Sequence, residues 1–176
     1  MASLLSETSL NEEQRDFVNT IKTCGDSLLT VINDILDFSK IESGQMTVLP
    51  ERAAAGKIAA EAVESMRPWT VKKGLRVELS DKAVGAEVSA DVPRTVQVLI
   101  NLLSNAIKFT PSGGAISVSV QPAPGGGEPA VLYSVKDSGP GIPKDQQEKV
   151  FEKFVQIASG EKHVGGTGLG LAIAKA

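Results

Sequence analysis

The sequence predicts an α+β fold, in which helices cover one face of a mixed sheet, preceded by one long helix of a bundle. Between Phe17 and Phe38, apolar residues recur at steps of three and four, which is the helical period. After residue 46, short strand-like runs alternate with helical ones, as in an α/β sandwich. We therefore expect two regions, a partial helical region at 1–45 and a larger domain at 46–176. Only 4% of the residues are aromatic, so the core should be mainly aliphatic.

Composition excludes several classes of protein. The net charge of −3 argues against binding to nucleic acid over the whole surface. One cysteine, Cys24, and one histidine, His163, exclude an internal disulfide framework and a multi-histidine metal centre. The sequence shows neither a signal peptide nor an apolar run of the ~18 residues that a membrane helix needs. We expect a cytoplasmic protein part without membrane contact of its own.

The long helix has a predicted start and a predicted end. Asn11 and Gln14 have the spacing of a capping box, and Gly44 is a plausible stop. Roughly 30 residues at ~1.5 Å each span about 45 Å, which exceeds the diameter of a small domain. The helix could lie on the surface of its own domain, but its apolar stripe favours a bundle or a dimer.

The remaining elements follow from composition and from glycine and proline positions. Strands are expected at Met46–Leu49, Leu75–Leu79, Ala86–Ser89, Ala115–Val120 and Val131–Lys136. Helices are expected at Ala53–Met66, Val92–Lys108, Lys144–Phe154 and from Gly168 onward. Pro68 should interrupt after the first helix, and Pro122–Pro129 should connect two strands of a hairpin.

A polar line runs along the helix predicted at Val92–Lys108. Gln97, Asn101, Asn105 and Lys108 are spaced four, four and three residues apart, so they share one helix face. Amide oxygens can ligate a hard divalent cation, and a lysine can meet a phosphate as a point charge. The same pattern also fits an ordinary solvated face.

Three further motifs follow in order. Asp137-Ser-Gly139-Pro-Gly141 comes directly after a strand and fits either a tight turn or a site where Asp137 accepts a hydrogen bond from an exocyclic amine. Phe151-Glu-Lys-Phe154 fits two core aromatic residues at a helix end. The run from Gly165 to Ala172 contains four glycines and leads into a helical pattern, which suits an anion bound by backbone N–H groups. It matches neither a Rossmann nor a Walker loop, and residues 157–166 before it resemble a lid.

Taken in this order, the four motifs resemble the N, G1, F and G2 boxes of sensor histidine kinases, which share the Bergerat ATP-binding fold with Hsp90, type II topoisomerases and MutL. The segment NTIKTCGDSLLTVINDILDFSKIESGQ resembles the second helix of the kinase dimerisation and histidine-phosphotransfer domain. The segment NLLSNAIKFT resembles histidine kinases more than their ATPase relatives, which have a catalytic glutamate at the position of Asn101.

The resemblance implies a role for individual residues. Asn101 and Asn105 would hold Mg²⁺ against the triphosphate of ATP, and Lys108 would contact phosphate. Asp137 would receive the adenine amino group. The remaining residues implied at the nucleotide are Gly139 and Gly141 at the adenine, Phe151 and Phe154 at the base of the lid, and Gly166, Thr167, Gly168, Leu169 and Gly170 around the phosphates.

The resemblance also implies a reaction, with two departures. The γ-phosphoryl group of Mg-ATP would pass to a histidine and then to an aspartate of a response-regulator receiver domain, in a homodimer formed through the N-terminal helix. The acceptor histidine of the family is absent, since Ala2-Ser-Leu-Leu resembles only the tail of the helix that carries it and His163 falls in the lid. The family also continues into two more strands after the G2 helix, so we expect the C-terminal strands of the domain to be missing here. The resemblance leaves open whether the parent protein is membrane-anchored. The alternatives are a non-catalytic ATP-binding or dimerisation module and a Bergerat-fold ATPase, and Asn101 argues against the second.

Overall fold

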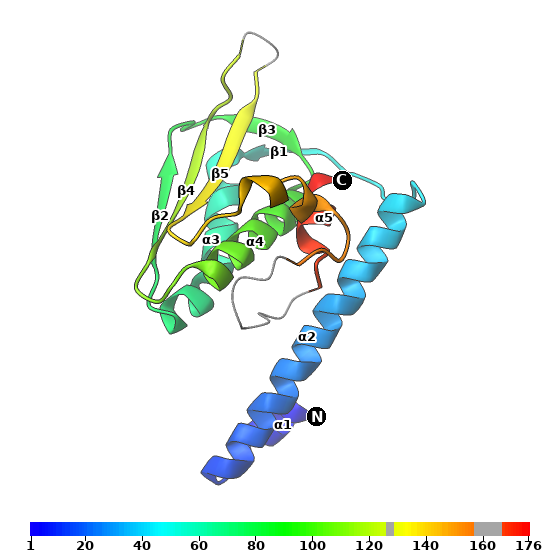
Figure 1. Ribbon diagram of the computed structural model, residues 1–176, viewed down its shortest axis with the longest axis vertical. Coiled ribbons are helices and arrows are strands. Elements are labelled where there is room, and N and C mark those ends of the chain that lie inside the picture. The colour runs from blue at the N-terminus through cyan, green and yellow to red at the C-terminus, as the bar shows by residue number, and fades with distance from the viewer. Residues whose placement is uncertain (126–128, 157–166) are drawn as a thin grey trace. The chain divides into compact units, whose positions relative to one another are not determined.

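The computed structural model describes residues 1–125, 129–156 and 167–176. It forms two compact units, Met1–Met46 and Thr47–Ala176 (Figure 1). In the described part of the chain, no helix has the length and apolar character needed to cross a membrane.

The first unit consists of two helices, α1 (Ala2–Ser6) and α2 (Glu12–Glu42), which pack against each other. The predicted capping box is confirmed, because Asn11 Oδ1 accepts from the Gln14 N–H at 2.8 Å and Gln14 Oε1 accepts from the Asn11 N–H at 3.1 Å. α2 ends at Glu42, and Gly44 follows with a φ of 65°, the left-handed conformation that ends many helices. Both ends of α2 are therefore set by neighbouring residues.

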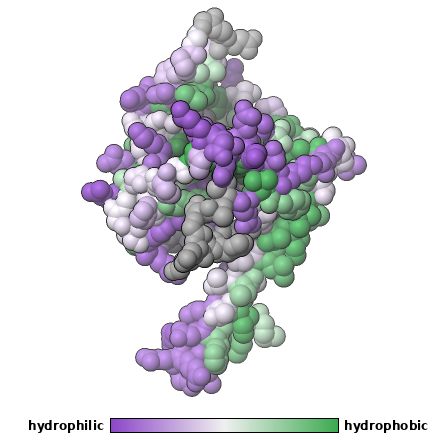
Figure 2. Space-filling view, viewed as in Figure 1, coloured by the Kyte–Doolittle hydropathy of each residue, from purple (hydrophilic) through white to green (hydrophobic). Residues whose placement is uncertain are grey.

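The apolar stripe of α2 remains largely uncovered. Figure 2 shows apolar residues gathered along this helix. Its large apolar side chains with 44–60% of their surface exposed are Phe17, Ile21, Leu28, Leu29, Ile32, Ile35 and Leu36. A stripe of this kind is typical of a helix that packs against other helices.

The described residues of the second unit form two sheets. Strands β1 (Glu51–Ala54) and β3 (Glu87–Ala90) form an antiparallel pair. The larger sheet has the order β2-β4-β5, in which β2 (Arg76–Asp81) is parallel to β4 (Ala115–Pro122) and β4 is antiparallel to β5 (Val131–Asp137). The mixed sheet that the sequence predicts is thus present.

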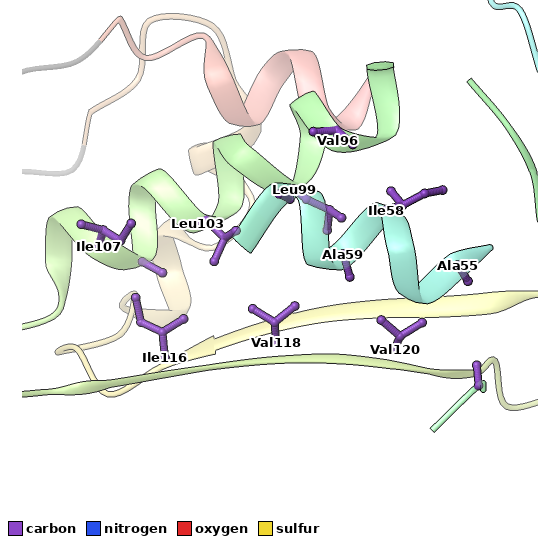
Figure 3. Close-up of a cluster of buried hydrophobic side chains, with 13 residues drawn as sticks. Ala55, Ile58, Ala59, Val96, Leu99, Leu103, Ile107, Ile116, Val118 and Val120 are labelled. Atoms are coloured by element: carbon purple, nitrogen blue, oxygen red, sulfur yellow. The ribbon is translucent and has the colours of Figure 1, made fainter. Parts of the chain in front are cut away.

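Helices α3 (Ala55–Lys72) and α4 (Val92–Phe109) cover one face of the larger sheet (Figures 1 and 3). The inward-facing residues of β4 are Ile116, Val118 and Val120, each at most 1% exposed. They lie opposite Ile58 of α3 and Leu103 of α4, which are equally buried (Figure 3). The core is aliphatic, as predicted, and it fixes α4 by its apolar side so that the opposite side is left for polar residues.

The first predicted strand is wrong, since Met46–Leu49 is not a strand and β1 begins at Glu51. Val48 and Leu49 are mostly exposed, and the Leu49 N–H donates to the Asp91 side chain at 3.0 Å instead of joining a ladder. The position of β1 is set by its pairing partner, because β3 forms its ladder with Glu51–Ala54. A strand's position depends on a distant segment that local hydrophobicity does not reveal.

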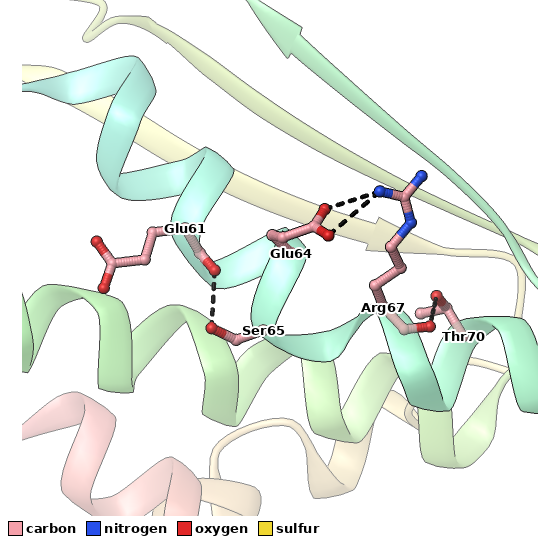
Figure 4. Close-up of polar contacts among 5 residues, drawn as sticks. All are labelled: Glu61, Glu64, Ser65, Arg67 and Thr70. Carbon is pink, nitrogen blue, oxygen red and sulfur yellow. Dashed lines mark hydrogen bonds and ion pairs between the residues drawn. The ribbon is translucent and has the colours of Figure 1, made fainter.

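The interruption predicted at Pro68 is also wrong, because α3 begins at Ala55 and runs through this proline to Lys72. A proline inside a helix removes one backbone hydrogen bond. Side chains around it supply local bonds: Arg67 pairs with Glu64 at 3.0 Å, and the Thr70 hydroxyl donates to the Arg67 carbonyl at 2.9 Å (Figure 4). The helix is uninterrupted at Pro68, and besides these local contacts it has a buried face packed on the core.

A further correction concerns the helix predicted at Lys144–Phe154. The structure has two short 3₁₀ turns there, η1 (Lys144–Gln146) and η2 (Lys149–Phe151). This segment is mainly polar and exposed, so no apolar face holds a longer helix against the core. The final helix, α5 (Gly170–Lys175), starts two residues later than predicted. The predicted lid at 157–166 and residues 126–128 of the hairpin connection lie outside the described residues.

Candidate functional site

Helix α4 supplies the first part of the site. Asp91 caps its N-terminus by accepting from the Arg94 N–H at 3.1 Å, and its Oδ2 accepts from the Leu49 N–H. These two hydrogen bonds hold the pKa of the Asp91 carboxyl below its ordinary value. The polar line predicted on α4 is half-buried, and it lies away from the core residues Leu99 and Leu103.

The two asparagines of this line have different surroundings. Asn101 Nδ2 donates to the carbonyl oxygen of Gly170, the first residue of α5, at 3.1 Å. The Asn105 side chain makes no hydrogen bond to any residue in the described part of the chain. Both the oxygen and the nitrogen of its carboxamide therefore lack a described partner, whereas at Asn101 one N–H of the amide is already donated.

The C-terminal turn of α4 carries Lys108, whose pKa is lower than the ordinary value for lysine. Partial burial lowers the pKa of Lys108, because desolvation disfavours the charged ammonium. Its Nζ lies 4.9 Å from the centre of the Phe109 ring. Lys73 donates from its own Nζ to the carbonyls of Ile107 and Lys108, at 2.6 and 2.9 Å. A cation at this position satisfies the last carbonyls of the helix.

Lys73 was not predicted. Lys73 lies more than 30 residues before the carbonyls that its Nζ contacts, so no local sequence pattern reveals this contact.

The Asp-Ser-Gly-Pro-Gly turn lies against the same end of α4. Asp137, the last residue of β5, accepts from the Gly139 N–H with Oδ1 at 2.7 Å and is otherwise exposed. A Cβ at Gly139 would lie 2.6 Å from this oxygen and 3.0 Å from the Phe109 carbonyl oxygen, so the turn packs directly on α4. Gly141 has a φ of 74°, which also requires glycine. The predicted tight turn with an Asx hydrogen bond is present, and the second Asp137 oxygen makes no hydrogen bond to a described residue.

The last two motifs are joined through their backbones. The Phe154 N–H donates to the Gly168 carbonyl at 3.0 Å, and both residues have positive φ, 61° and 71°. A Cβ at Gly168 would lie 2.8 Å from Phe154 Cα, so no other residue fits without a shift. The Thr167 hydroxyl accepts from the N–H of Leu169, which is almost completely buried.

Phe151 and Phe154 are not core residues. Their exposed fractions are 40% and 66%, and the Lys175 ammonium lies 5.4 Å from the centre of the Phe151 ring. The interpretation of this motif as two core aromatics is therefore wrong. The predicted site residue Gly166, and His163 with it, lie outside the described residues.

The four motifs thus meet around α4. Phe109 at its end contacts the Gly139 turn, Asn101 in its middle bonds to Gly170, and Gly168 ties Phe154 to the same segment. Among the residues that the structure describes, no group of three or more His, Cys, Asp or Glu side chains could hold a metal ion. A cation bound here would depend on amide oxygens and on oxygens that a ligand brings.

Two family models match the chain. Residues 1–44 match the His Kinase A (phospho-acceptor) domain, and residues 90–176 match the histidine kinase-, DNA gyrase B- and HSP90-like ATPase family. These two matches fall in different structural units.

Relatives and solved structures give the same result. The autoinducer 2 sensor kinase/phosphatase LuxQ of Vibrio parahaemolyticus is 35% identical over 99% of this chain, which spans 21% of that protein's length. The structure of full-length ShkA in complex with AMPPNP aligns with a TM-score of 0.79 and 32% identity, over 99% of this chain and 35% of that one. A nucleotide-free structure of the catalytic domain of the histidine kinase ThkA aligns with a TM-score of 0.60 and 30% identity, over 71% of this chain and 78% of that one.

Proposed function

The chain belongs to the sensor histidine kinases, and from this premise we propose that its second unit binds Mg-ATP along α4 for phosphoryl transfer to a histidine. The observation that carries the proposal is the convergence on α4 of the Gly139 turn and the Gly168–Gly170 segment. In the full reaction the phosphoryl group then moves to an aspartate of a response-regulator receiver domain.

Adenine is proposed to bind at Asp137. One of its oxygens holds the Gly139 N–H, and the side chain is otherwise exposed at the end of β5. A carboxylate only accepts hydrogen bonds, so it suits the exocyclic amine of adenine and not a carbonyl at the same position. Gly139 and Gly141 would shape the pocket, because side chains there would clash or require a strained backbone.

The triphosphate and Mg²⁺ are proposed to lie farther along α4. The donor set fits a hard cation in part, since Asn105 has an open carboxamide and Asn101 retains its oxygen. Two amide oxygens make a weak site alone, so the metal would arrive bound to ATP. Lys108 would contact a phosphate, and the backbone of Thr167–Gly170, with Gly166 outside the described residues, would surround the others.

The proposed chemistry is an in-line displacement at the γ-phosphorus. The bond from phosphorus to the bridging oxygen breaks, a bond to a histidine nitrogen forms, and ADP leaves with the electron pair. Mg²⁺ would offset negative charge on the phosphate oxygens. The residues of this chain contribute positioning and charge neutralisation, and Asn101 is no general base, which disfavours the ATPase alternative.

The first unit is proposed to dimerise through the exposed apolar stripe of α2. A helix of 31 residues with one uncovered apolar face is suited to a bundle with a second copy. The acceptor histidine would be presented on such a bundle. His163 is proposed not to be the acceptor, because its sequence position falls in the ATP-binding unit between Phe154 and Gly168.

The adenine contact gives a direct test of nucleotide binding. Asp137→Asn keeps the shape of the side chain but replaces a charged acceptor, so the affinity for ATP should fall about tenfold to a hundredfold. Asp145→Asn, at an exposed position in η1, is the matched control and should bind like the unmutated chain. Isothermal titration measures both, and unchanged affinity in Asp137→Asn would remove this residue from the site.

The transfer step needs a separate assay. With γ-labelled Mg-ATP alone, the chain should acquire no acid-labile label, whereas an added acceptor helix from a related kinase should become labelled. Asn105→Ala should reduce that labelling far more than His163→Ala. Acid-labile label on His163 itself would contradict the proposal that the acceptor lies outside this unit.

A further inference from the structure

Asn101 and Asn105 lie one turn apart on the same side of α4, yet among the described residues only the Asn101 side chain is hydrogen-bonded to another element. The Asn101 carboxamide donates its Nδ2 hydrogen to Gly170, and a Cβ at Gly170 would lie 3.5 Å from Asn101 Cγ and 3.6 Å from Oδ1. The side chain thus contacts the start of α5 through a hydrogen bond, and a side chain at position 170 would come into contact with the Asn101 carboxamide. Asn105 has no comparable bond to any described residue.

The element that Asn101 holds needs external support. α5 has six residues, and a helix of that length does not persist in water by itself. Leu169, Ala172 and Ile173 anchor it by burial, but apolar burial is not directional and restrains rotation and sliding less sharply than a hydrogen bond does. The Asn101 bond to Gly170 adds direction at the residue where the glycine-rich segment enters the helix.

We propose that Asn101 is a positioning residue, whose nitrogen fixes the Thr167–Gly170 segment relative to α4 while its oxygen stays available to the metal. This inference rests on the proposed function, because the positioned segment is the one proposed to surround the phosphates. Asn105 then has a simpler role as a metal ligand. The two asparagines therefore have different roles, positioning for Asn101 and metal ligation for Asn105, although they share a residue type and a helix face.

The chemistry of the side chain explains why an amide is needed. A carboxamide offers a donor and a hard acceptor oxygen on one planar group, so a bond at the nitrogen also sets the direction of the oxygen. Aspartate would keep the oxygens but could not donate to the Gly170 carbonyl when ionised. Alanine would keep neither.

Hydrogen exchange without nucleotide or metal tests the tie itself. The Ile173 N–H, which donates to the Leu169 carbonyl at 2.8 Å, reports opening of α5. Asn101→Ala and Asn101→Asp should each exchange there about threefold to tenfold faster than the unmutated chain. Asn105→Ala is the matched control and should leave this exchange rate unchanged. Equal acceleration in Asn105→Ala, or acceleration by Asn101→Ala alone, would overturn a role for the hydrogen bond.

Nucleotide binding in EDTA separates positioning from metal ligation. If Asn101 positions the segment, Asn101→Ala should lower the affinity for ATP about threefold to tenfold even without Mg²⁺. Its affinity for adenosine should equal that of the unmutated chain. A loss seen only with Mg²⁺ would assign Asn101 to the metal alone, and an equal loss for adenosine would indicate general damage; either overturns the proposal. If the unmutated chain binds no ATP, the proposed function fails, while the exchange experiment still decides whether Asn101 holds α5.

Discussion

The two units of this chain use apolar residues in opposite ways. In α2, leucines and isoleucines form a stripe that is about half exposed, and the ends of the helix are set by the cap at Asn11 and by Gly44, which follows the C-cap Ser43. In the second unit, residues such as Leu103 and Val118 are completely enclosed between α3, α4 and β4. Apolar content alone therefore does not distinguish a core from an interface.

This difference separates local from distant determinants of structure. The bounds of α2 follow from residues within four positions of each end. The site in the second unit depends on contacts between residues far apart in the sequence, such as Asn101 with Gly170 and Lys73 with the end of α4. Substitutions in the two units should accordingly affect different observables.

The largest difference is expected between two leucines, both in helices. Leu103→Asp would bury a charge at a position that is 1% exposed, and should cost the second unit more than about 4 kcal/mol and unfold it. Leu28→Asp changes a side chain that is 60% exposed and should leave the melting of this unit unchanged. Its effect should fall on self-association, most clearly together with Ile32→Asp.

Circular dichroism melting and sedimentation distinguish these outcomes. An unmutated chain that is monomeric at all concentrations, or a dimer that survives both aspartates, would contradict the interface assigned to α2. A folded second unit in Leu103→Asp would contradict the assignment of the core.

A smaller effect is expected at two glycines of the same loop. Gly168→Ala places a Cβ against the Phe154 backbone at a φ of 71°, so it should destabilise the segment by about 1–3 kcal/mol and weaken ATP binding. A Cβ at Gly170 makes only an ordinary contact with Asn101, and alanine should be tolerated in thermal unfolding. Equal melting temperatures for the two variants would show that the Phe154 contact does not restrict position 168.

The smallest effects are expected at the two helix caps. Asn11→Ala should lower the stability of α2 by about 1 kcal/mol at every pH, since its cap is neutral. Asp91 differs because its folded pKa is depressed by the Leu49 and Arg94 N–H groups. Its contribution is therefore complete above the ordinary pKa of 3.8 and is lost as the pH falls through the lower folded pKa.

Acid unfolding of the second unit provides the measurement for Asp91. Asp91→Asn should flatten the decline in stability below about pH 4, because the amide does not titrate. If the stability of Asp91→Asn declines at low pH as steeply as that of the unmutated chain, other carboxyl groups control the acid unfolding. The same titration of Asn11→Ala should differ from the unmutated chain by a constant amount.

Sequence patterns succeeded where the deciding interactions are local. The capping box, the stop at Gly44, the long helix and the helix predicted at Val92–Lys108 follow from spacing and from glycine, and the structure has each of them, the last as α4 at Val92–Phe109. The failures share a cause. Hydrophobicity predicts the first strand at Met46–Leu49, whereas pairing with β3 places β1 at Glu51–Ala54. Pro68 predicts an interruption, whereas α3 continues through it along the core.

The order of the four motifs, their residue types and the amphipathic character of α2 can be read from the amino-acid sequence, because these are properties of neighbouring residues. Which residues of those motifs meet depends on the folded chain. It bonds Asn101 to Gly170, packs Gly139 on Phe109 and fits Gly168 against Phe154, and it leaves Asn105 without a described partner. The physical reason is that identical side chains on one helix face differ only through what a distant segment brings against them.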